Sequence, residues 1–558
     1  MQESRIRSSA AEVFGWSELR TGQLDAISGV LDGRDTLVVM PTGGGKSAVY
    51  QVAGLLLEGV TVVISPLLAL EADQIAGLAA HPLAPAAVAV NSLNSAQANR
   101  LAWVAVQSGE ARYLFLSPEQ LASAQVQGRL AELRVALVVV DEAHCVASWG
   151  ADFRPAYLGI ADAVESLTAP RRPDAPTPSR PPLLALTATG SPPVRSEIVA
   201  RLRLRDPRVL TSGFDRPNLH LAVRRHSHDH ERTDAVVAEV LALAGAGAPA
   251  PTPGTGLVYV ATRAQAVQLS DALAAHGLRA RPFHSGLARA ERLGTQESFR
   301  AGELDVVVAT SAFGMGIDRA DVRFVVHAAA PESLDSFSQE IGRAGRDGLP
   351  AATTLHYRSE DLGLGTFFAS GAVSGERIGA VVNAVVHGGA DSVDALHRIL
   401  NISPASIQRV LNLLEAAGRL RVESGRIALL TRASAELLVA DAAELARQHE
   451  RIEQTRVAMM RSYAETDRCR RQLLLGYFGE PRTGLCGHCD TCDDGRAAAH
   501  QREVEAIGLI AGDRIGHTIW GPGVVLDVQP HAFTAYFDRE GYRTVSLETL
   551  SEGLVALL

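Results

Sequence analysis

A glycine-rich loop holds the single lysine of this chain. The sequence contains 52 arginines but one lysine, Lys46, which lies in Pro41-Thr42-Gly43-Gly44-Gly45-Lys46-Ser47. In such a loop the backbone N–H groups bind phosphate oxygens, the ammonium reaches the terminal phosphates and the hydroxyl holds Mg²⁺. A coding bias against lysine would explain the excess of arginine but not the position of Lys46. The loop therefore predicts nucleotide binding by Thr42, Gly43, Gly44, Gly45, Lys46 and Ser47.

Two neighbouring acids end a predicted buried strand. Asp141 and Glu142 follow the apolar residues 135–140 in the motif Asp141-Glu142-Ala143-His144. An acid at such a strand end can hold the water shell of Mg²⁺ opposite a phosphate loop, and the next acid can polarise an attacking water. A pair of solvated loop acids is the alternative. Together with the loop, the motif predicts hydrolysis of a nucleoside triphosphate, with Ser47 and Asp141 holding Mg²⁺.

Two arginines far along the chain are candidates for the same reaction. Arg343 and Arg346 lie in Gln339-Glu340-Ile341-Gly342-Arg343-Ala344-Gly345-Arg346-Asp347. Arginines that reach across a cleft stabilise the charge that develops on a γ-phosphate. The alternative is the usual fate of exposed arginines, which is to form weak surface ion pairs. The predicted catalytic residues are Lys46, Asp141, Glu142, Gln339, Arg343 and Arg346.

The elements that must position these residues are two successive arrays of strands and helices. Near-continuous apolar runs predict parallel strands that are buried on both faces. They occupy residues 35–40, 60–65, 111–117, 135–140 and 182–187, and then 255–261, 278–284, 304–310, 322–328 and 352–357. Two alternating arrays of this kind predict an α/β fold with two doubly wound parallel-sheet domains, residues 1–210 and 211–365.

Beyond these arrays the pattern changes. Residues 391–430 are predicted to form a helix, a turn, a second helix that starts at Ser403-Pro404, and two short strands. This order is typical of a winged helix, for which we expect residues 366–440. In the tail, residues 496–558, glycines separate alternating strands and predict a small β-barrel of the SH3 or Tudor kind.

Four of the five cysteines follow a metal-ligand spacing. Cys469, Cys486, Cys489 and Cys492 form C-x16-C-x2-C-x2-C within a predicted helical module of residues 441–495. Four thiolates at this spacing suit a closed, tetrahedral, structural Zn²⁺ site. A redox C-x-x-C pair is the alternative, but it needs no further cysteines. Residues 451–482 also hold seven arginines against four acids, which predicts a basic surface for a DNA backbone or, alternatively, a solvated helix face.

The composition excludes several classes of protein. A net charge of −9 gives no global signature of nucleic-acid binding, so any contact with DNA must be local. The polar N-terminus shows no signal peptide, and no apolar run is long enough to span a membrane. Five cysteines in 558 residues argue against a disulfide scaffold. We expect a cytoplasmic protein that has no membrane partner.

Taken in order, the motifs resemble those of the RecQ-like superfamily 2 ATP-dependent DNA helicases over residues 10–360. The matching segments are Phe14-Gly15-Trp16 with Arg20, Gly22 and Gln23, then residues 65–70, 141–144, 185–189, 213–218, 309–310, 313–318 and 339–346. The resemblance implies two RecA-like domains that enclose one ATP. It implies that Trp16 stacks on the adenine and that Arg20 and Gln23 bond to its edge. It also implies nucleotide contacts by Gly316 and Asp318.

The resemblance extends to the contacts with DNA. Residues 148–155 are similar to the aromatic-rich loop through which RecQ helicases couple single-strand binding to hydrolysis. Aromatic side chains there stack on bases, and an arginine stacks or binds phosphate; ordinary packing is the alternative for the aromatic residues. The residues that the resemblance assigns to DNA are Trp149, Phe153, Arg154, Ser65 and Thr310.

The chain also departs from the family pattern. Ser148 and Ala151 stand where the family usually has Gln and His, so the coupling could be looser or differently wired. The winged-helix-like segment precedes the cysteines, whereas RecQ proteins typically place it after them. No HRDC-like helical domain is visible at the end of the sequence. These departures indicate a four-cysteine RecQ-like clade that lacks the HRDC domain.

The leading hypothesis is an ATP-dependent DNA helicase or translocase that uses ATP, Mg²⁺ and Zn²⁺. It would move on single-stranded DNA with the 3′→5′ polarity that the resemblance implies, and would unwind tailed duplexes in DNA repair or recombination. We expect a monomer in the cytoplasm, associated with the nucleoid. One alternative is an ATPase that remodels duplexes or protein–DNA complexes without processive unwinding. The other is a non-catalytic DNA-binding scaffold, against which the intact Lys46, Glu142 and Arg346 argue.

Overall fold

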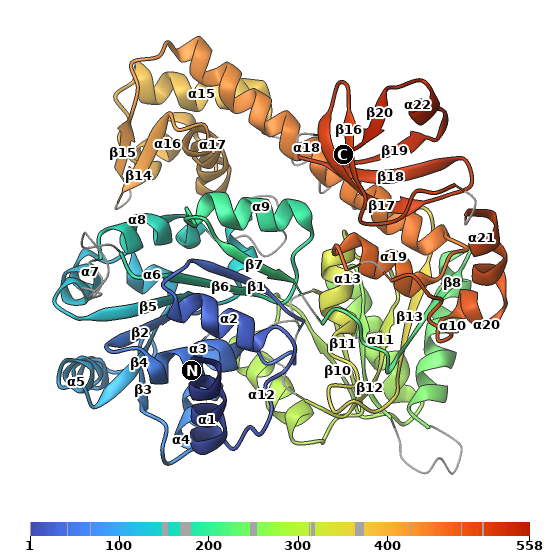
Figure 1. Cartoon of the computed structure of the whole chain (residues 1–558), viewed down its shortest axis with the longest axis horizontal. Coiled ribbons are helices and arrows are strands. Elements are labelled where there is room, and N and C mark those ends of the chain that lie inside the picture. Colours follow the sequence, from blue (N-terminus) through green and yellow to red (C-terminus); the bar gives the residue numbers. More distant parts are fainter. Residues whose placement is uncertain are drawn as a thin grey trace.

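The computed structural model contains two α/β lobes side by side, with two smaller units above them (Figure 1). It describes residues 2–558 except 42, 67, 148–154, 168–179, 212, 246–253, 312, 314–318, 363–372, 424–425, 481, 505–506 and 539. We call the lobe that carries the phosphate loop lobe 1 and the following α/β lobe lobe 2. The predicted α/β fold with two parallel sheets is confirmed.

Lobe 1 contains a parallel sheet of seven strands in the order β3-β4-β2-β5-β6-β1-β7. The five predicted strands are β1 (Thr36–Val39), β2 (Val60–Ile64), β4 (Ala111–Leu116), β5 (Val135–Val140) and β6 (Leu183–Thr187). Two further strands, β3 (Ala86–Val90) and β7 (Arg208–Thr211), lie at the two edges. Edge strands are only partly covered, so they lack the continuous apolar run by which a central strand is recognised.

Helices cover both faces of this sheet. Along β1, Leu37 and Val39 belong to one apolar core and Val38 and Met40 to the other, because successive side chains of a strand point to opposite faces. The helices are α1 (Gln2–Phe14), α2 (Gln23–Leu31), α3 (Lys46–Leu56), α4 (Leu68–Ala79), α5 (Ala96–Gln107), α6 (Pro118–Leu121), α7 (Ala124–Ala131), α8 (Ile160–Glu165) and α9 (Pro192–Arg201), with 3-10 turns η1 (Ala143–Val146) and η2 (Pro155–Gly159).

Lobe 2 repeats the plan with six parallel strands in the order β10-β11-β9-β12-β13-β8. Its strands are β8 (Leu219–Arg225), β9 (Thr255–Tyr259), β10 (Ala280–Phe283), β11 (Val306–Ala309), β12 (Val322–His327) and β13 (Ala351–Tyr357). Its helices are α10 (Asp229–Leu243), α11 (Arg263–Ala275), α12 (Arg289–Arg300) and α13 (Leu334–Ile341). The edge strand β8 was not predicted, because its apolar run is interrupted by His220 and ends at Arg224 and Arg225.

The winged-helix-like unit has its own apolar core. Helices α15 (Gly375–Val386), α16 (Val393–Leu400) and α17 (Pro404–Ala416) precede a hairpin of β14 (Leu420–Glu423) and β15 (Arg426–Leu429). Ser403 caps α17 by accepting a hydrogen bond from the N–H of Ser406 at 3.4 Å, and Pro404 follows at the first helical position. The predicted order of helix, turn, helix and hairpin is therefore confirmed.

A long helix connects this unit to the rest of the C-terminal half. Helix α18 (Ala435–Glu465) has 31 residues and leads to α19 (Arg470–Tyr477), α20 (Asp490–Asp493) and α21 (Arg496–Val504). The tail forms an antiparallel sheet in the order β19-β18-β17-β16-β20, which contains β16 (Arg514–His517), β17 (Gly521–Val528), β18 (Ala532–Phe537), β19 (Gly541–Ser546) and β20 (Val555–Leu557), with α22 (Glu548–Ser551). The small all-β tail is confirmed, but no ladder between its described end strands β19 and β20 closes it into a barrel.

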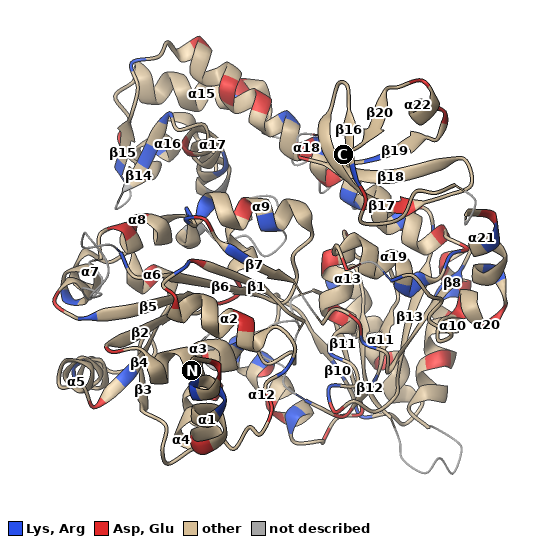
Figure 2. Cartoon of the chain, viewed as in Figure 1, with Lys and Arg blue, Asp and Glu red and all other residues tan. Residues whose placement is uncertain are grey.

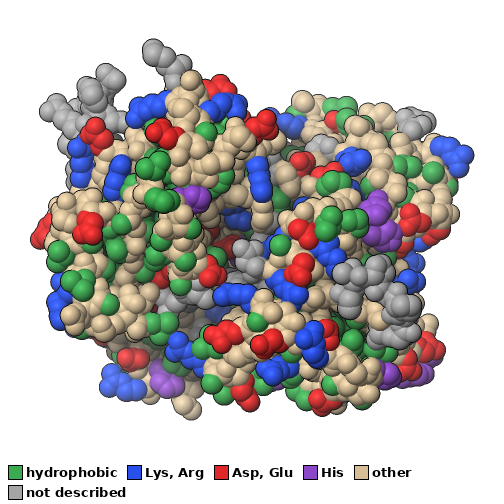
Figure 3. All heavy atoms as spheres, turned by 90° about the horizontal axis from the view of Figure 1, so that it is seen from below, with side chains coloured by type: hydrophobic (Ala, Val, Ile, Leu, Met, Phe, Trp, Pro, Cys, Tyr) green, Lys and Arg blue, Asp and Glu red, His purple; other side chains and the backbone are tan. Residues whose placement is uncertain are grey.

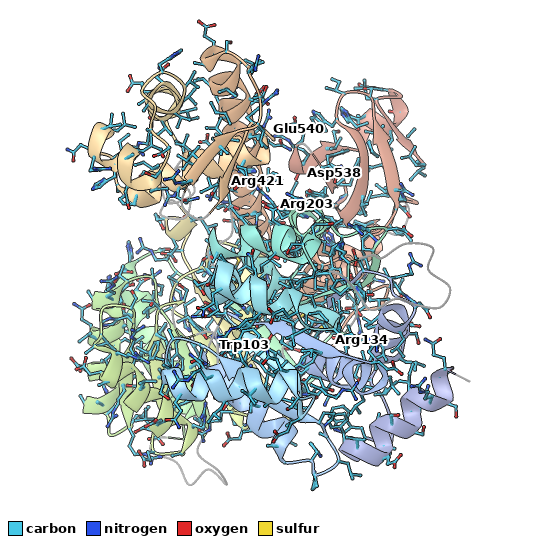
Figure 4. The ribbon with its side chains drawn as sticks, turned by 90° about the vertical axis from the view of Figure 1, so that its left-hand side faces the viewer. Trp103, Arg134, Arg203, Arg421, Asp538 and Glu540 are labelled. Atoms are coloured by element: carbon cyan, nitrogen blue, oxygen red, sulfur yellow. The ribbon has the colours of Figure 1, made fainter. Side chains whose placement is uncertain are left out.

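Three units meet around a cavity of about 440 Å³. Its walls come from α8 and α9 of lobe 1, from α17, from α18 and from the end of β18. Arg203 donates a hydrogen bond to Asp162 at 2.7 Å, and Arg421 of β14 lies 3.8 Å from the same carboxylate. Figure 4 labels Arg203, Arg421 and Asp538 at this junction. The wing therefore contacts lobe 1 through a carboxylate that two arginines share.

The prediction of a basic DNA-binding surface at residues 451–482 is wrong for the core of that segment. Figure 2 shows acidic residues close to the basic ones along α18 and α19. Three of its arginines are buried and bind acids, in the pairs Arg456–Asp335, Arg470–Asp490 and Arg471–Asp215. A count of charges along the sequence cannot reveal partners that come from distant segments. Across the described residues, none of the helices combines the length and apolar character that crossing a membrane requires.

Candidate nucleotide site and metal centre

The phosphate loop lies between β1 and α3. Gly43 and Gly45 have φ angles of 80° and 82°, in the left-handed region that glycine adopts without strain. A Cβ on Gly44 would come within 2.9 Å of the carbonyl oxygen of Pro41. The loop therefore needs glycine at these positions, and it ends at the N-terminus of α3, where the helix dipole favours a phosphate.

Lys46 is the first residue of α3 and lies over the loop. Its Nζ donates a hydrogen bond to the carbonyl oxygen of Met40 at 3.1 Å. Burial lowers the pKa of its ammonium, the charges of Glu142 and Asp141 raise it, and the charge of Arg346 lowers it again. Arg346 belongs to lobe 2, so residues of both lobes determine the electrostatic environment of Lys46.

Asp141 is buried at the end of β5. Its carboxylate accepts hydrogen bonds from the N–H of Glu142 at 3.0 Å and from Nε2 of Gln74 at 3.3 Å, and Gln74 accepts one from the hydroxyl of Tyr50 at 2.8 Å. Burial and the neighbouring Glu142 raise the pKa of Asp141 to about 6, although Lys46 opposes the shift. Glu142 has a φ of 48°, a strained backbone that is often found at functional sites.

A chain of polar contacts leads from Glu142 to the loop after β6. His144 Nδ1 lies 3.4 Å from Glu142 Oε2 and 3.0 Å from the hydroxyl of Thr187. Thr187 in turn donates a hydrogen bond to the carbonyl oxygen of Thr189 at 2.7 Å. The acid pair is thereby connected to the segment 185–189 that precedes α9.

Arg343 and Arg346 follow α13 of lobe 2, on which Gln339 is half-buried. The Cγ of Arg346 lies 4.0 Å from the position that a Cβ on Gly43 would take. A cavity of about 300 Å³ opens between the lobes, and it is lined by Arg20, Thr21, Met40, Pro41, Gly43 and Gly44 of lobe 1 and by Gly213, Arg216, Asn218, Gly345, Arg346 and Gly348. Figure 3 shows the molecule hollowed between its lobes, with basic side chains at the rim. The structure thus brings Arg346 to the phosphate loop, whereas Arg343 is buried and is not among the residues that line this cavity.

The four predicted zinc ligands come together after α18. One sulfur atom from each of Cys469, Cys486, Cys489 and Cys492 lies within 4.8 Å of the others. The sulfur atoms of Cys486 and Cys492 are 3.8 Å apart, which is about the edge of a tetrahedron with Zn–S bonds of about 2.3 Å. His488 is engaged elsewhere, because its ring lies edge-on to His220 at 5.1 Å. The donor set therefore fits one tetrahedral Zn²⁺.

Comparison with known proteins identifies the family. Residues 20–196 match the DEAD/DEAH box helicase model, residues 250–348 the helicase conserved C-terminal domain and residues 431–493 the RecQ zinc-binding model. The ATP-dependent DNA helicase RecQ of Bacillus subtilis is 31% identical over 498 residues, which are 88% of this chain and 68% of the relative. The chain belongs to the RecQ family. The zinc-binding match contains all four cysteines, so the prediction of Zn²⁺ is confirmed together with that of ATP and Mg²⁺.

The match covers only part of some RecQ relatives. The RecQ of Pasteurella multocida is 32% identical over 485 residues, which are 86% of this chain but 61% of the relative. Among solved structures, the DUF1998 helicase MrfA bound to DNA has a TM-score of 0.52 at 16% identity, over 78% of this chain and 63% of that chain. This similarity confirms the fold of two paired α/β lobes.

The segment that resembles the RecQ adenine site contacts the phosphate loop. Trp16 stacks on Phe14 with ring centroids 4.5 Å apart. Gln23 is buried, donates a hydrogen bond to the carbonyl oxygen of Gly45 at 2.8 Å and accepts one from the N–H of Arg20 at 2.7 Å. The guanidinium of Arg20 donates to the carbonyl oxygen of Gly43. Contacts of these side chains with an adenine base stay a prediction.

The residues assigned to DNA by the RecQ resemblance are only partly described. Ser65 follows β2 and is fully buried, and Thr310 follows β11 and is half-buried. Both lie at the carboxyl ends of central strands, where parallel α/β sheets bind ligands. Trp149, Phe153 and Arg154 lie outside the described residues, as do the predicted nucleotide contacts Thr42, Gly316 and Asp318.

Two further residues of this RecQ chain hold the turn that carries Arg343 and Arg346. Arg216 donates hydrogen bonds to the carbonyl oxygens of Ala344 and Gly345, both at 2.8 Å, and to that of Gly342 at 3.3 Å. Asn218 donates to the carbonyl oxygens of Gly345 at 2.8 Å and Leu349 at 2.9 Å. Their segment was recognised in the sequence, but this role was not, because the accepting carbonyl groups are more than 100 residues away.

Proposed function

We propose that this chain hydrolyses ATP between its two lobes and uses the energy to move on DNA and to separate its strands. One observation carries the proposal. Arg346 of lobe 2 lies beside Gly43 of the phosphate loop of lobe 1, where a guanidinium can stabilise the charge that develops on a γ-phosphate. Membership of the RecQ family supports DNA as the track.

The proposed roles follow from the positions of the side chains. The phosphate loop and Lys46 bind the phosphates, and Ser47 and Asp141 are the residues that would hold Mg²⁺, which screens phosphate charge when bound. Glu142 accepts a proton from the attacking water, and Gln339 helps to orient it. Arg343 and Arg346 stabilise the transition state only while the lobes are close together, so hydrolysis depends on closure of the cleft.

The proposed DNA contacts are distributed over both lobes. Ser65 and Thr310 lie at the carboxyl ends of parallel strands in lobes 1 and 2, and Trp149, Phe153 and Arg154 would stack on bases or bind phosphate. Cycles of closure and opening would then advance one strand across the two lobes. We propose 3′→5′ movement, action on tailed duplexes in repair or recombination, a monomeric state and association with the nucleoid, on the strength of the family resemblance.

A second candidate function is remodelling of duplexes or protein–DNA complexes without processive unwinding. The observation that favours it is the replacement of the usual Gln and His of the aromatic-rich loop by Ser148 and Ala151. Without these side chains, DNA binding at the loop would stimulate ATP hydrolysis less strongly.

One set of measurements separates these functions. ATP hydrolysis is measured with and without single-stranded DNA, and strand separation is measured on duplexes with 3′ or 5′ tails. Stimulated hydrolysis with unwinding of the 3′-tailed duplex supports the helicase. Stimulated hydrolysis without strand separation favours remodelling, and no hydrolysis in any condition rules out both enzymes.

A further inference from the structure

Asp335 is a buried carboxylate at which both lobes meet the zinc module, by which we mean residues 441–495 with α19, α20 and most of α18. It is 6% exposed and lies in the first turn of α13 in lobe 2. Ser191 of lobe 1 donates its N–H and its hydroxyl to it, each at 3.2 Å. Tyr477 of α19 donates its hydroxyl at 2.6 Å, and Arg456 of α18 donates Nη2 at 3.1 Å. One side chain of lobe 2 thus bonds to lobe 1 and to two helices of the zinc module.

Ser191 connects lobe 1 to this carboxylate with a side chain that does not cap its own helix. It stands at the N-cap of α9, where a serine usually accepts a hydrogen bond from the helix backbone, yet it makes no such bond. Its hydroxyl is directed to Asp335 instead. Ser191 also follows closely on Thr187 and Thr189, which the contacts of His144 connect to Glu142.

On the lobe 2 side, Asp335 is rigidly connected to the predicted catalytic arginines. It is the second residue of the eight-residue helix α13, and Arg343 follows the end of that helix. Arg456 also donates a hydrogen bond at 3.2 Å to the hydroxyl of Ser333, the residue that caps α13. Because a helix of two turns moves as one body, a shift of Asp335 also shifts the start of the turn that carries Arg343 and Arg346.

The C-terminal sheet reaches the same point through Tyr477. Tyr542 of β19 stacks on Tyr477 with ring centroids 5.2 Å apart, and its N–H donates to the hydroxyl of Thr455 on α18 at 3.1 Å. Burial and the charge of Asp335 raise the pKa of Tyr477, so this hydroxyl stays protonated and remains a donor. The contacts therefore continue from β19 to the lobe interface.

We propose that Asp335 is a positioning residue that holds the two lobes in the arrangement that hydrolyses ATP, and that the zinc module and the C-terminal sheet act on hydrolysis through it. This inference rests on the proposed function. The carboxylate is buried and negatively charged, so each donor that is removed leaves it less well compensated. Loss of the Tyr477 hydroxyl weakens the hold on α13 without touching the phosphate loop.

The test compares Tyr477→Phe with a matched variant, Tyr463→Phe. Tyr463 is also fully buried and belongs to the zinc module, but its hydroxyl makes no hydrogen bond within the described part of the chain. We expect Tyr477→Phe to lower kcat for DNA-stimulated hydrolysis about tenfold, as for loss of a hydrogen bond to a charged group. KM for ATP should stay unchanged, because an interaction that acts only in the transition state lowers kcat alone.

Two further measurements separate positioning from stability. Ser191→Ala weakens the same carboxylate from lobe 1, so the double variant with Tyr477→Phe should lose less than the product of the single losses. A distance between spectroscopic labels at exposed Ser108 of lobe 1 and Ala275 of lobe 2 should shorten with an ATP analogue in the unmodified chain and in Tyr463→Phe, but less in Tyr477→Phe.

The outcomes are distinct. If Tyr477→Phe matches Tyr463→Phe in kcat and in label distance while the unmodified chain hydrolyses ATP, the Asp335 proposal is overturned and the proposed function stands. The Asp335 proposal is also overturned if the loss of kcat is proportional to a loss of folded protein and bound zinc while the label distance shortens as in the unmodified chain. If the unmodified chain hydrolyses no ATP, the proposed function fails and this inference fails with it.

Discussion

Arg346 of lobe 2 faces Gly43 of lobe 1 across the nucleotide cavity, with its Cγ 4.0 Å from the position that a Cβ on Gly43 would take. Both residues line the same space of about 300 Å³. Because they belong to different lobes, any change in the separation of the lobes changes the distance from the guanidinium to a bound phosphate. Hydrolysis should therefore depend on closure of the cleft.

Replacement of Lys46 should abolish hydrolysis. In Lys46→Ala no ammonium reaches the phosphates, and in Lys46→Arg a planar guanidinium fits the tight loop poorly. We expect kcat to fall by about 10²-fold or more in both variants, while DNA binding stays largely intact. The measurements are steady-state ATPase rates and DNA binding by fluorescence anisotropy. Normal hydrolysis by either variant would show that Lys46 does not bind the phosphates.

Arg216→Ala should impair hydrolysis although Arg216 has no assigned contact with the nucleotide. Without its hydrogen bonds to the carbonyl oxygens of Gly342, Ala344 and Gly345, the turn that carries Arg346 loses its support. We expect kcat to fall about tenfold or more, as misplacement of a catalytic group does. Arg279→Ala serves as the control, since Arg279 forms an exposed ion pair with Asp305 in the same lobe. Equal rates in the two variants would contradict the positioning role.

Glu71 should make lobe 1 less stable at higher pH. It is 1% exposed, and burial raises its pKa from 4.5 to about 7, although a hydrogen bond from Asn91 opposes the shift. A raised pKa in the folded state means that its contribution is fully present below about pH 4.5 and is lost as pH rises towards 7. The loss amounts to up to about 3 kcal/mol.

The variant Glu71→Gln removes this titration. We compare the melting temperature of Glu71→Gln with that of the unmodified chain at each pH. The variant should gain more, or lose less, relative to the unmodified chain at pH 8 than at pH 5. Glu110→Gln, at an exposed position of the same lobe, should show no such difference between the two pH values. A melting-temperature difference for Glu71→Gln that does not change with pH would mean that Glu71 is ionised throughout this range.

The zinc centre should hold the zinc module on lobe 2. Cys489 lies beside Leu221 of β8 in a backbone bridge, and Asp490 accepts a hydrogen bond from the N–H of Val223 at 3.0 Å. We expect one zinc per chain by mass spectrometry, and its loss in Cys489→Ser, with faster amide hydrogen exchange at Val223 and no change at the phosphate loop. The control Cys145→Ser should keep the metal. If the purified protein contained no zinc, the assignment of a four-thiolate zinc site would be contradicted.

Elements with a strong local signal could be predicted from the sequence. The central strands carry near-continuous apolar runs because both of their faces are covered, and β1 and β5 lead directly into the loop of Lys46 and the acids Asp141 and Glu142. The edge strands β3, β7 and β8 are half-covered and gave no such signal. The hairpin of the wing and the four cysteines were also predictable, because turn residues and ligand spacing are local properties.

Relations between distant segments could not be predicted in this way. The buried arginines of α18 and α19 bind acids that lie far away in sequence, so a local excess of positive charge suggested a DNA surface instead. Asp335 is not one of the motif residues to which we assigned a role. Its partners come from three other parts of the chain. Such a site becomes visible only when the fold brings its members together.

The most direct test of hydrolysis between the lobes is the ATPase rate of Arg346→Ala with saturating single-stranded DNA, measured together with binding of a fluorescent ATP analogue. We predict that kcat falls by about 10³-fold, as for loss of an arginine that stabilises the transferred phosphoryl group, while the analogue still binds to lobe 1. A rate close to that of the unmodified chain would contradict catalysis between the two lobes.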